Sequence, residues 1–183
     1  MEKQTFHYTQ RAIQIRRGDL KQNAGEDIRV VPEGLKKLRQ AEIQEQWRAG
    51  RENGFVSTTK TMGKGLFAQA ALKKGTLIGE YLGKEATGPI VEKYFNKPPS
   101  VYCFFWIEDG DMIMRDAKKT RNNVRYMNHA IKNSNCRIEL VELDGRMRPL
   151  MCTRRAINMG EQLFWDYGER DKEILKNHKF LSK

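Results

Sequence analysis

The spacing of apolar residues predicts a helix in the stretch that follows Pro32. Proline suits a first helical turn, and glycine often follows the last one, so the helix should end near Gly50 or Gly54. Its apolar positions are Leu35, Leu38, Ile43 and Trp47. Because this stripe is loose, we expect a flanking helix within residues 35–54 that packs on the side of a domain. Residues 1–34 have no clear period, which predicts a basic and polar extension ahead of it.

From residue 55 onward the pattern changes to short apolar or alternating runs separated by turn residues. Asp-Gly pairs at 109–110 and 144–145 each separate two such runs, which predicts two β-hairpins. The predicted strands are residues 55–59, 77–82, 101–107, 112–115, 137–143 and 147–153. The pattern therefore predicts a mainly β fold with few helices. Residues 84–100 look like a variable insertion, and residues 171–176 are the last helix candidate.

The composition is that of a soluble globular protein, with 183 residues, 39% hydrophobic and 31% charged. No apolar run approaches the roughly 20 residues that span a bilayer, and the N-terminus lacks the apolar core of a secretory signal. We therefore expect an intracellular protein. Three cysteines without CxxC spacing support neither a disulfide framework nor a zinc cluster, so no metal site is predicted. A net charge of +11 favours polyanionic partners such as nucleic acid, although many basic proteins bind none.

Two short motifs near the C-terminus carry the candidate chemistry. The first is Asn128-His129 in a mostly apolar segment, and the second is residues 165–168, Trp-Asp-Tyr-Gly, after a β-like run. Upstream lie residues 62–65, Met-Gly-Lys-Gly, and Tyr102. In this order the motifs resemble those of the SET-domain protein-lysine methyltransferases. That family commonly has lysine where this chain has methionine at the start of the Gly-x-Gly run.

The resemblance implies a SET domain over residues 55–168, built of small curved sheets with a threaded, pseudo-knotted C-terminal segment. It also implies that residues 169–183 close the site of the cofactor, S-adenosylmethionine (SAM). The helix before the Gly-x-Gly loop, the Asp-Gly turn at 144–145 and the short tail are most similar to the class that monomethylates lysine 20 of histone H4.

That class implies a monomeric nuclear enzyme whose substrate is the histone H4 tail in nucleosomes. Its basic residues would contact an acidic nucleosomal surface or DNA. Two alternatives stay open. One is a SET methyltransferase of a non-histone protein, and the other is a catalytically silent SET-like module that binds chromatin.

The resemblance also assigns candidate roles to individual residues. The catalytic candidates are Tyr167, Tyr81 and Trp165. The cofactor-binding candidates are Met62, Gly63, Lys64, Gly65, Tyr102, Asn128, His129 and Phe180. The substrate-binding candidates are Tyr81, Tyr102, Trp165 and Tyr167. Without the resemblance, each tyrosine could equally be an ordinary core or strand aromatic.

The chemistry of methyl transfer explains why these residue types suit the role. The acceptor lysine must be neutral, and with a free pKa near ~10.4 its deprotonation at neutral pH costs roughly 4 kcal/mol. An aromatic-walled channel lowers that pKa by desolvation while its rings contact the cation. The hydroxyl of Tyr167 would orient the amine. Trp165 is bulkier than the tyrosine or phenylalanine that the family has there, which predicts a monomethyl product.

The remaining site residues are expected to hold the cofactor or support the loops. Gly63 and Gly65 lack a Cβ and would let the backbone approach the cofactor closely. Asn128 both donates and accepts hydrogen bonds, which suits a zwitterionic ligand. His129 is expected to be a hydrogen-bonded structural histidine rather than a general base, and Arg125 is expected to brace its loop.

Overall fold

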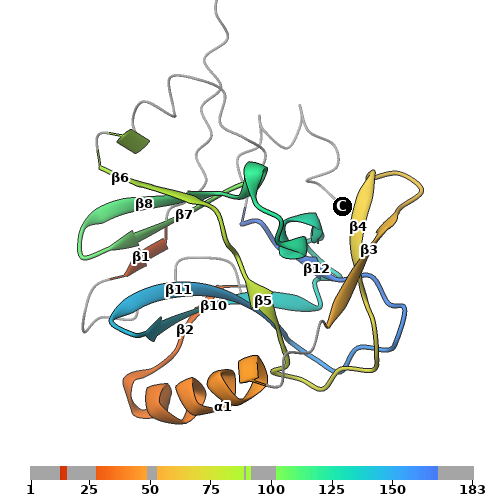
Figure 1. Ribbon diagram of the computed structural model, residues 1–183, viewed down its shortest axis with the longest axis horizontal. Helices are drawn as coiled ribbons and strands as arrows, with labels where there is room; N and C mark the ends of the chain where they lie inside the picture. Colours follow the sequence, from red (N-terminus) through yellow and green to blue (C-terminus); the bar gives the residue numbers. More distant parts are fainter. Residues whose placement is uncertain (1–12, 16–27, 49–52, 89, 92–101, 169–183) are drawn as a thin grey trace, which may run out of the picture.

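Two four-stranded sheets form the body of the molecule (Figure 1). The computed structural model describes residues 13–15, 28–48, 53–88, 90–91 and 102–168. The first sheet has the order β1 (Ile13–Ile15), β7 (Cys103–Glu108), β8 (Asp111–Asp116) and β6 (Lys84–Thr87). The second has the order β2 (Ile28–Val30), β10 (Cys136–Leu143), β11 (Arg146–Thr153) and β5 (Leu77–Glu80).

Two strand pairs and a few helical segments complete the described part of the chain. The strands β3 (Gly54–Thr58) and β4 (Lys64–Ala68) form an antiparallel hairpin. The short strands β9 (Asn128–His129) and β12 (Phe164–Trp165) pair in parallel. The helical segments are η1 (Glu33–Leu35), α1 (Lys36–Arg48), η2 (Ala117–Lys119) and η3 (Asn123–Tyr126).

The prediction of a mainly β fold with few helices is confirmed, and so are both Asp-Gly hairpins. The turn between β7 and β8 has φ of 51° at Asp109 and 93° at Gly110. The turn between β10 and β11 has φ of 52° at Asp144 and 71° at Gly145. Two consecutive left-handed residues give a type I′ turn, whose twist matches the twist of the strands it joins. Asp-Gly is a preferred sequence for that backbone.

Two connecting segments contain strands that the sequence pattern did not predict. The part before Pro32 contains strands, because β1 pairs in parallel with β7 and β2 pairs in parallel with β10. Three-residue strands are too short to show a sequence period, which is why the pattern suggested none. The stretch beginning at Lys84 likewise contains β6, which pairs antiparallel with β8 and extends the first sheet.

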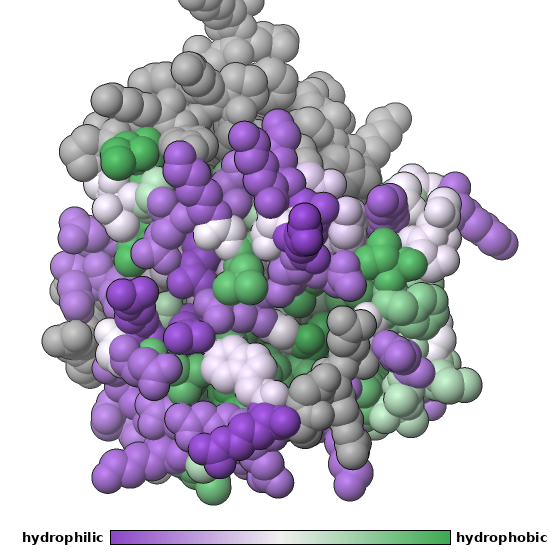
Figure 2. All heavy atoms as spheres, in the orientation of Figure 1, coloured by the Kyte–Doolittle hydropathy of each residue, from purple (hydrophilic) through white to green (hydrophobic). Residues whose placement is uncertain are grey.

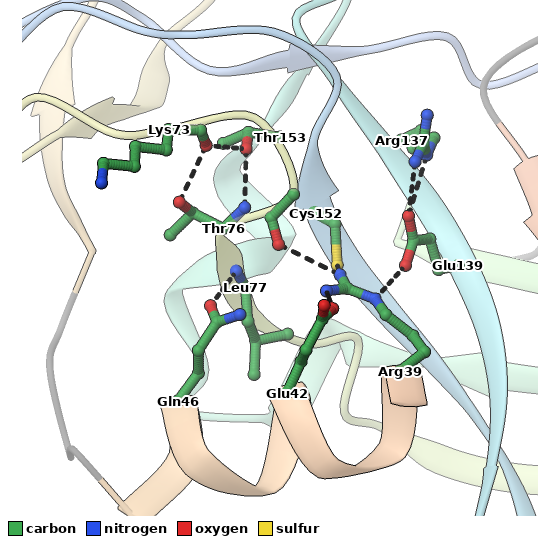
Figure 3. A network of polar contacts seen from close by, with 11 residues as sticks. Arg39, Glu42, Gln46, Lys73, Thr76, Leu77, Arg137, Glu139, Cys152 and Thr153 are labelled. Atoms are coloured by element: carbon green, nitrogen blue, oxygen red, sulfur yellow. Dashed lines mark hydrogen bonds and ion pairs between the residues drawn. The ribbon is translucent and has the colours of Figure 1, made fainter. Parts of the chain in front are cut away.

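The helix α1 packs beneath β10 and is attached to the sheet by polar groups (Figure 3). The guanidinium of Arg39 donates to the Glu139 carboxylate at 2.8 Å, to the Gly75 carbonyl at 3.1 Å and to the Cys152 sulfur at 3.1 Å. Burial raises the pKa of the Cys152 thiol to about 12, so the sulfur stays protonated. The side-chain oxygen of Gln46 also accepts a hydrogen bond from the Leu77 amide at 2.7 Å.

The apolar stripe predicted for this helix is therefore only partly correct. Ile43 is fully buried, whereas Leu35 and Leu38 are 46% and 63% exposed. Trp47 lies at the surface, with the Arg148 guanidinium 5.5 Å from its ring. No helix in the described ranges has the length and apolarity to cross a membrane.

The main core joins side chains from both sheets and from both strand pairs. Its aromatic members are Tyr81, Phe104, Trp106 and Trp165. A second cluster lies between α1 and the second sheet and includes Ile43, Leu77 and Val141. The candidate chemistry lies at the edge of the main core, where the β9–β12 pair meets the first sheet.

Candidate active site

The pairing of β9 with β12 brings the two C-terminal motifs side by side. Asn128 is opposite Phe164 and His129 is opposite Trp165 in the parallel register. The amide of Ala130 continues the ladder with a bond to the Trp165 carbonyl at 3.2 Å. The chain between the two strands runs out through β10 and back through β11, so motifs distant in sequence become neighbours (Figure 1).

Asn135 clamps the second motif in place, a role that no pattern in the sequence indicates. Its side-chain nitrogen donates to the Gln162 carbonyl at 2.8 Å and to the Glu161 carboxylate at 3.0 Å. Its side-chain oxygen accepts from the Phe164 amide at 2.8 Å. The residue is 1% exposed, so these bonds are shielded from water. Nothing in the sequence separates Asn135 from its exposed neighbour Asn133.

Tyr167 lies directly against the Asn-His segment. Its hydroxyl donates to the Met127 carbonyl at 2.8 Å, and its amide donates to His129 Nδ1 at 3.0 Å. Its ring centroid lies 4.9 Å from that of His129 and 4.8 Å from that of Trp165. Burial raises the pKa of Tyr167 above its ordinary value, so the phenol keeps its proton at neutral pH. Because the Tyr167 hydroxyl donates its hydrogen bond to the Met127 carbonyl, the lone pairs of the phenol oxygen can accept a hydrogen bond from an amine.

His129 is held as a structural residue. It is 3% exposed, and Nδ1 accepts the Tyr167 amide, which assigns the proton of the neutral ring to Nε2. Protonating Nδ1 would break this bond. The geometry therefore fits the expected hydrogen-bonded histidine better than a general base.

Aromatic rings line the core side of Tyr167. The Tyr81 ring lies 5.9 Å from Phe104 and 6.4 Å from Trp165, and Phe104 meets Trp165 edge-on at 6.1 Å. The Tyr81 hydroxyl donates to the Tyr102 carbonyl at 2.9 Å. Burial, followed by the neighbouring Tyr167, raises the pKa of Tyr81 well above its ordinary value. The wall is thus neutral and polarisable, which suits a cation that must lose its proton.

Tyr102 is half-buried and connects this wall to Arg125. The Arg125 guanidinium lies 5.8 Å from the Tyr102 ring and 4.7 Å from the Tyr126 ring. It also donates to the carbonyls of Ala117 at 3.2 Å and Lys118 at 2.6 Å. Arg125 therefore braces the η2–η3 loop, as the sequence suggested.

The glycine-containing turn between β3 and β4 approaches the same junction. The Asn128 side-chain nitrogen donates to the Lys64 carbonyl at 3.1 Å. A Cβ on Gly65 would lie 2.7 Å from Gln162 Nε2 and 3.2 Å from Asn128 Nδ2. A side chain at this position would therefore force its neighbours, the Gln162 side chain among them, to shift.

The start of the turn is open. Gly63 has φ of 68° with free space where a Cβ would be, and the Met62 amide donates to Thr59 Oγ1 at 2.8 Å. Lys64 is exposed, with its ammonium 5.4 Å from the Tyr126 ring. Phe180 and the helix candidate 171–176 lie outside the described residues.

The polar groups at this turn fit a ligand that carries both donors and acceptors. Gln162 Nε2 is buried and has no hydrogen-bond partner among the described residues. Asn128 has committed only its nitrogen, so its Oδ1 can accept a bond. A buried donor without a partner is costly, so it indicates a place for an acceptor from outside the described chain. An amino acid-like ligand end, with its carboxylate and ammonium, supplies both kinds of group.

Comparison with protein families finds that the SET domain model matches residues 63–168. The chain is 33% identical over 129 residues to Histone-lysine N-methyltransferase trr of Drosophila melanogaster, covering 68% of this chain and 5% of that protein. It is 30% identical over 139 residues to N-lysine methyltransferase KMT5A-A of Danio rerio, covering 72% and 40%.

Histone-lysine N-methyltransferase set-1 of Caenorhabditis elegans is 26% identical over 125 residues, covering 65% of this chain and 52% of that protein. This chain thus spans at most about half the length of these relatives. The crystal structure of CpSET8 from Cryptosporidium superposes with a TM-score of 0.61 at 21% identity, over 76% of this chain and 68% of that one. This likeness shows the same fold, so the predicted fold class is confirmed.

Proposed function

Because this chain belongs to the SET-domain family, we propose that it is a SAM-dependent protein-lysine N-methyltransferase. The observation that carries the proposal is the position of Tyr167. Its hydroxyl is fixed on the Met127 carbonyl, beside the Asn-His segment and at the end of an aromatic wall.

In this proposal Tyr167 orients the acceptor amine. The phenol oxygen accepts a hydrogen bond from the neutral lysine, because its own proton is engaged with the backbone. That bond leaves the nitrogen lone pair free to point along the line of displacement. Tyr81 and Trp165 exclude water on the other side of the amine, so the neutral form of the lysine is favoured. Tyr102 contributes its carbonyl, which fixes the Tyr81 hydroxyl.

The cofactor would be held where the turn between β3 and β4 meets β9. Asn128 Oδ1 and Gln162 Nε2 offer an acceptor and a donor, and the backbone of residues 62–65 offers close approach at two glycines. The His129 backbone and the segment 169–183, with Phe180, are proposed to complete the enclosure. When bound, SAM supplies an electrophilic methyl group on a sulfonium.

We further propose a histone H4 tail lysine of the lysine-20 type as the substrate, modified once, in nuclear chromatin. The names of the relatives support a histone-lysine substrate class, since two of the three are called histone-lysine N-methyltransferases. The bulk of Trp165, 5% exposed and packed against Tyr167, supports a single methyl because it leaves little room beside the amine.

The proposal is tested by incubating the protein with methyl-labelled SAM and either nucleosomes, free histones or a non-histone protein mixture. Label on a histone H4 lysine is the expected result, and label only on other proteins would reassign the substrate. A thermal shift with SAM separates a silent module from an enzyme, because ligand at ~100 times its Kd should stabilise by roughly 2.7 kcal/mol. If the protein shows no label transfer and no thermal shift with SAM, the assignment is overturned.

A further inference from the structure

Two segments that contain no acidic residue pack against each other on one side of the molecule. Residues 53–79 and 117–138 hold no aspartate or glutamate. They meet where η3 packs on β3, β4 and β5, and where Asn128 binds the Lys64 carbonyl. Neither segment therefore supplies a carboxylate to this contact.

Four cations are presented here: Lys64, Lys118, Lys119 and Arg121 are all exposed, and we call them the basic face. None of them makes an ion pair within the described part of the chain. Arg125 connects them, since its guanidinium binds the Lys118 carbonyl and stacks on the Tyr126 ring, with the Lys64 ammonium over the same ring. In Figure 2 hydrophilic residues cover the green and teal helical turns of Figure 1, which carry η2 and η3, as they cover much of this face.

Three arginines elsewhere in the described part of the chain are paired with acids. Arg39, Arg115 and Arg155 each lie within 3.0 Å of a carboxylate oxygen. The nearest acid to the basic face, Asp116, uses its carboxylate to cap η2 through the Lys118 amide. Unlike these three arginines, the four cations of the basic face have no carboxylate partner in the described part of the chain.

The basic face is hollowed beside Arg121. The hollow lies at the start of β3, and four of its lining residues are polar: Asn53, Arg121, Asn122 and Asn123. The others are Gly54 and the apolar residues Leu66, Ile78 and Val124. Asn53 and Asn122 are engaged with backbone carbonyls, at 2.7 Å and 3.0 Å respectively, so the walls are rigid. Arg121 thus stands at a polar concavity, which is the arrangement that receives a phosphate group.

We propose that the basic face binds the sugar-phosphate backbone of duplex DNA. Duplex DNA presents one negative charge every ~1.7 Å along its axis, which matches several unpaired cations displayed together. A histone tail is itself basic and would be repelled by this surface, so DNA fits it better than the tail does. The proposal extends the proposed function, because a chromatin substrate carries DNA next to the tail, but binding is measurable without catalysis.

The test is DNA binding by fluorescence anisotropy, with the full chain, a labelled duplex of about two helical turns and a series of salt concentrations. The test variant is the triple change Lys118→Gln, Lys119→Gln and Arg121→Gln. The control is Lys37→Gln, Arg48→Gln and Arg146→Gln, which removes the same charge from exposed positions on α1 and on the β10–β11 hairpin. Thermal melting of both variants checks that folding is retained.

The test variant should bind at least about tenfold more weakly near 0.1 M salt, with a plot of log K against log salt flatter by roughly one per lost contact. The control should bind nearly as the unchanged chain. Equal losses in both variants would overturn the proposal, because only net charge would then matter. Equal binding of polyglutamate at the same face would also overturn it, in favour of an acidic protein partner. Methylation of a short tail peptide, measured separately, reports on the catalytic proposal alone.

Discussion

Replacing Asn135 by aspartate changes almost no volume but reverses the polarity of the clamp on the C-terminal motif. The native side chain donates two bonds, to Gln162 and Glu161, and accepts one from Phe164. A carboxylate can still accept from the Phe164 amide, but it cannot donate to Gln162 or Glu161. One of its oxygens would replace the native nitrogen, which lies 3.0 Å from the Glu161 carboxylate. Leaving the Gln162 carbonyl unpaired costs about 1–3 kcal/mol, and repulsion between the new carboxylate and Glu161 adds to this cost. We expect Asn135→Asp to lower the free energy of unfolding by about 3 kcal/mol at pH 7.

The loss should depend on pH, in a direction that follows from the burial of the new carboxyl group. Burial and the adjacent Glu161 raise its folded-state pKa above the unfolded value near ~3.9, because both disfavour its charge. The hydrogen bond from Arg155 lowers the pKa of Glu161 to about 2, so that neighbour starts ionised. A raised folded pKa stabilises the fold below the unfolded pKa, and this contribution is lost as pH rises through the folded pKa. The variant should therefore approach the unchanged chain as pH falls from 7 towards 4.

Urea unfolding followed by circular dichroism at several pH values measures this effect. The matched control is Asn133→Asp, which introduces the same group at an exposed position two residues away. The control should lose less than about 0.5 kcal/mol at every pH, as surface changes usually do. If Asn135→Asp behaves like the control, or grows less stable on acidification relative to it, the bonds of Asn135 do not stabilise the segment 161–164 as argued.

Three further changes probe the helix anchor, the glycine turn and the product. Arg39→Met should cost about 2–3 kcal/mol of unfolding free energy, because the buried Glu139 keeps only its second arginine partner; a cost under ~0.5 would contradict the anchor. Gly65→Ala should weaken SAM binding about tenfold by calorimetry, since the added carbon would lie 2.7 Å from Gln162; unchanged affinity would argue against a cofactor there. Trp165→Phe should add dimethyl-lysine to a monomethyl product in mass spectra, and abundant trimethyl-lysine from the unchanged chain would refute the steric argument.

Local sequence rules predicted the strands and turns well because each is a short-range property. An Asp-Gly pair between alternating runs requires a left-handed turn, and both such turns are present. The short strands β1 and β2 were not predicted, because they form by pairing with β7 and β10, which are far away in the sequence. The attachment of α1 to the sheet through Arg39 was not predicted for a similar reason, because the carboxylate that Arg39 binds, Glu139, lies 100 residues away in the sequence.

The candidate site was predicted by the order of its motifs rather than by any physical signal in one residue. Tyr167 and His129 look like ordinary core residues until the β9–β12 pairing brings them into contact. Asn135 could not be singled out, because a polar run before a strand normally indicates only a loop. Its importance appears when three of its bonds converge on the segment from 161 to 164.

Tandem mass spectrometry of nucleosomal histones after incubation with SAM tests the central claim most directly. The unchanged chain should place a single methyl group on a lysine of the H4 tail. Tyr167→Phe should leave that lysine unmodified while still giving a thermal shift with SAM, because in the proposed function the phenol binds the amine and the turn between β3 and β4 binds the cofactor. Full methylation by the phenylalanine variant would contradict the role of the hydroxyl, and an unmodified tail in both samples would contradict the substrate.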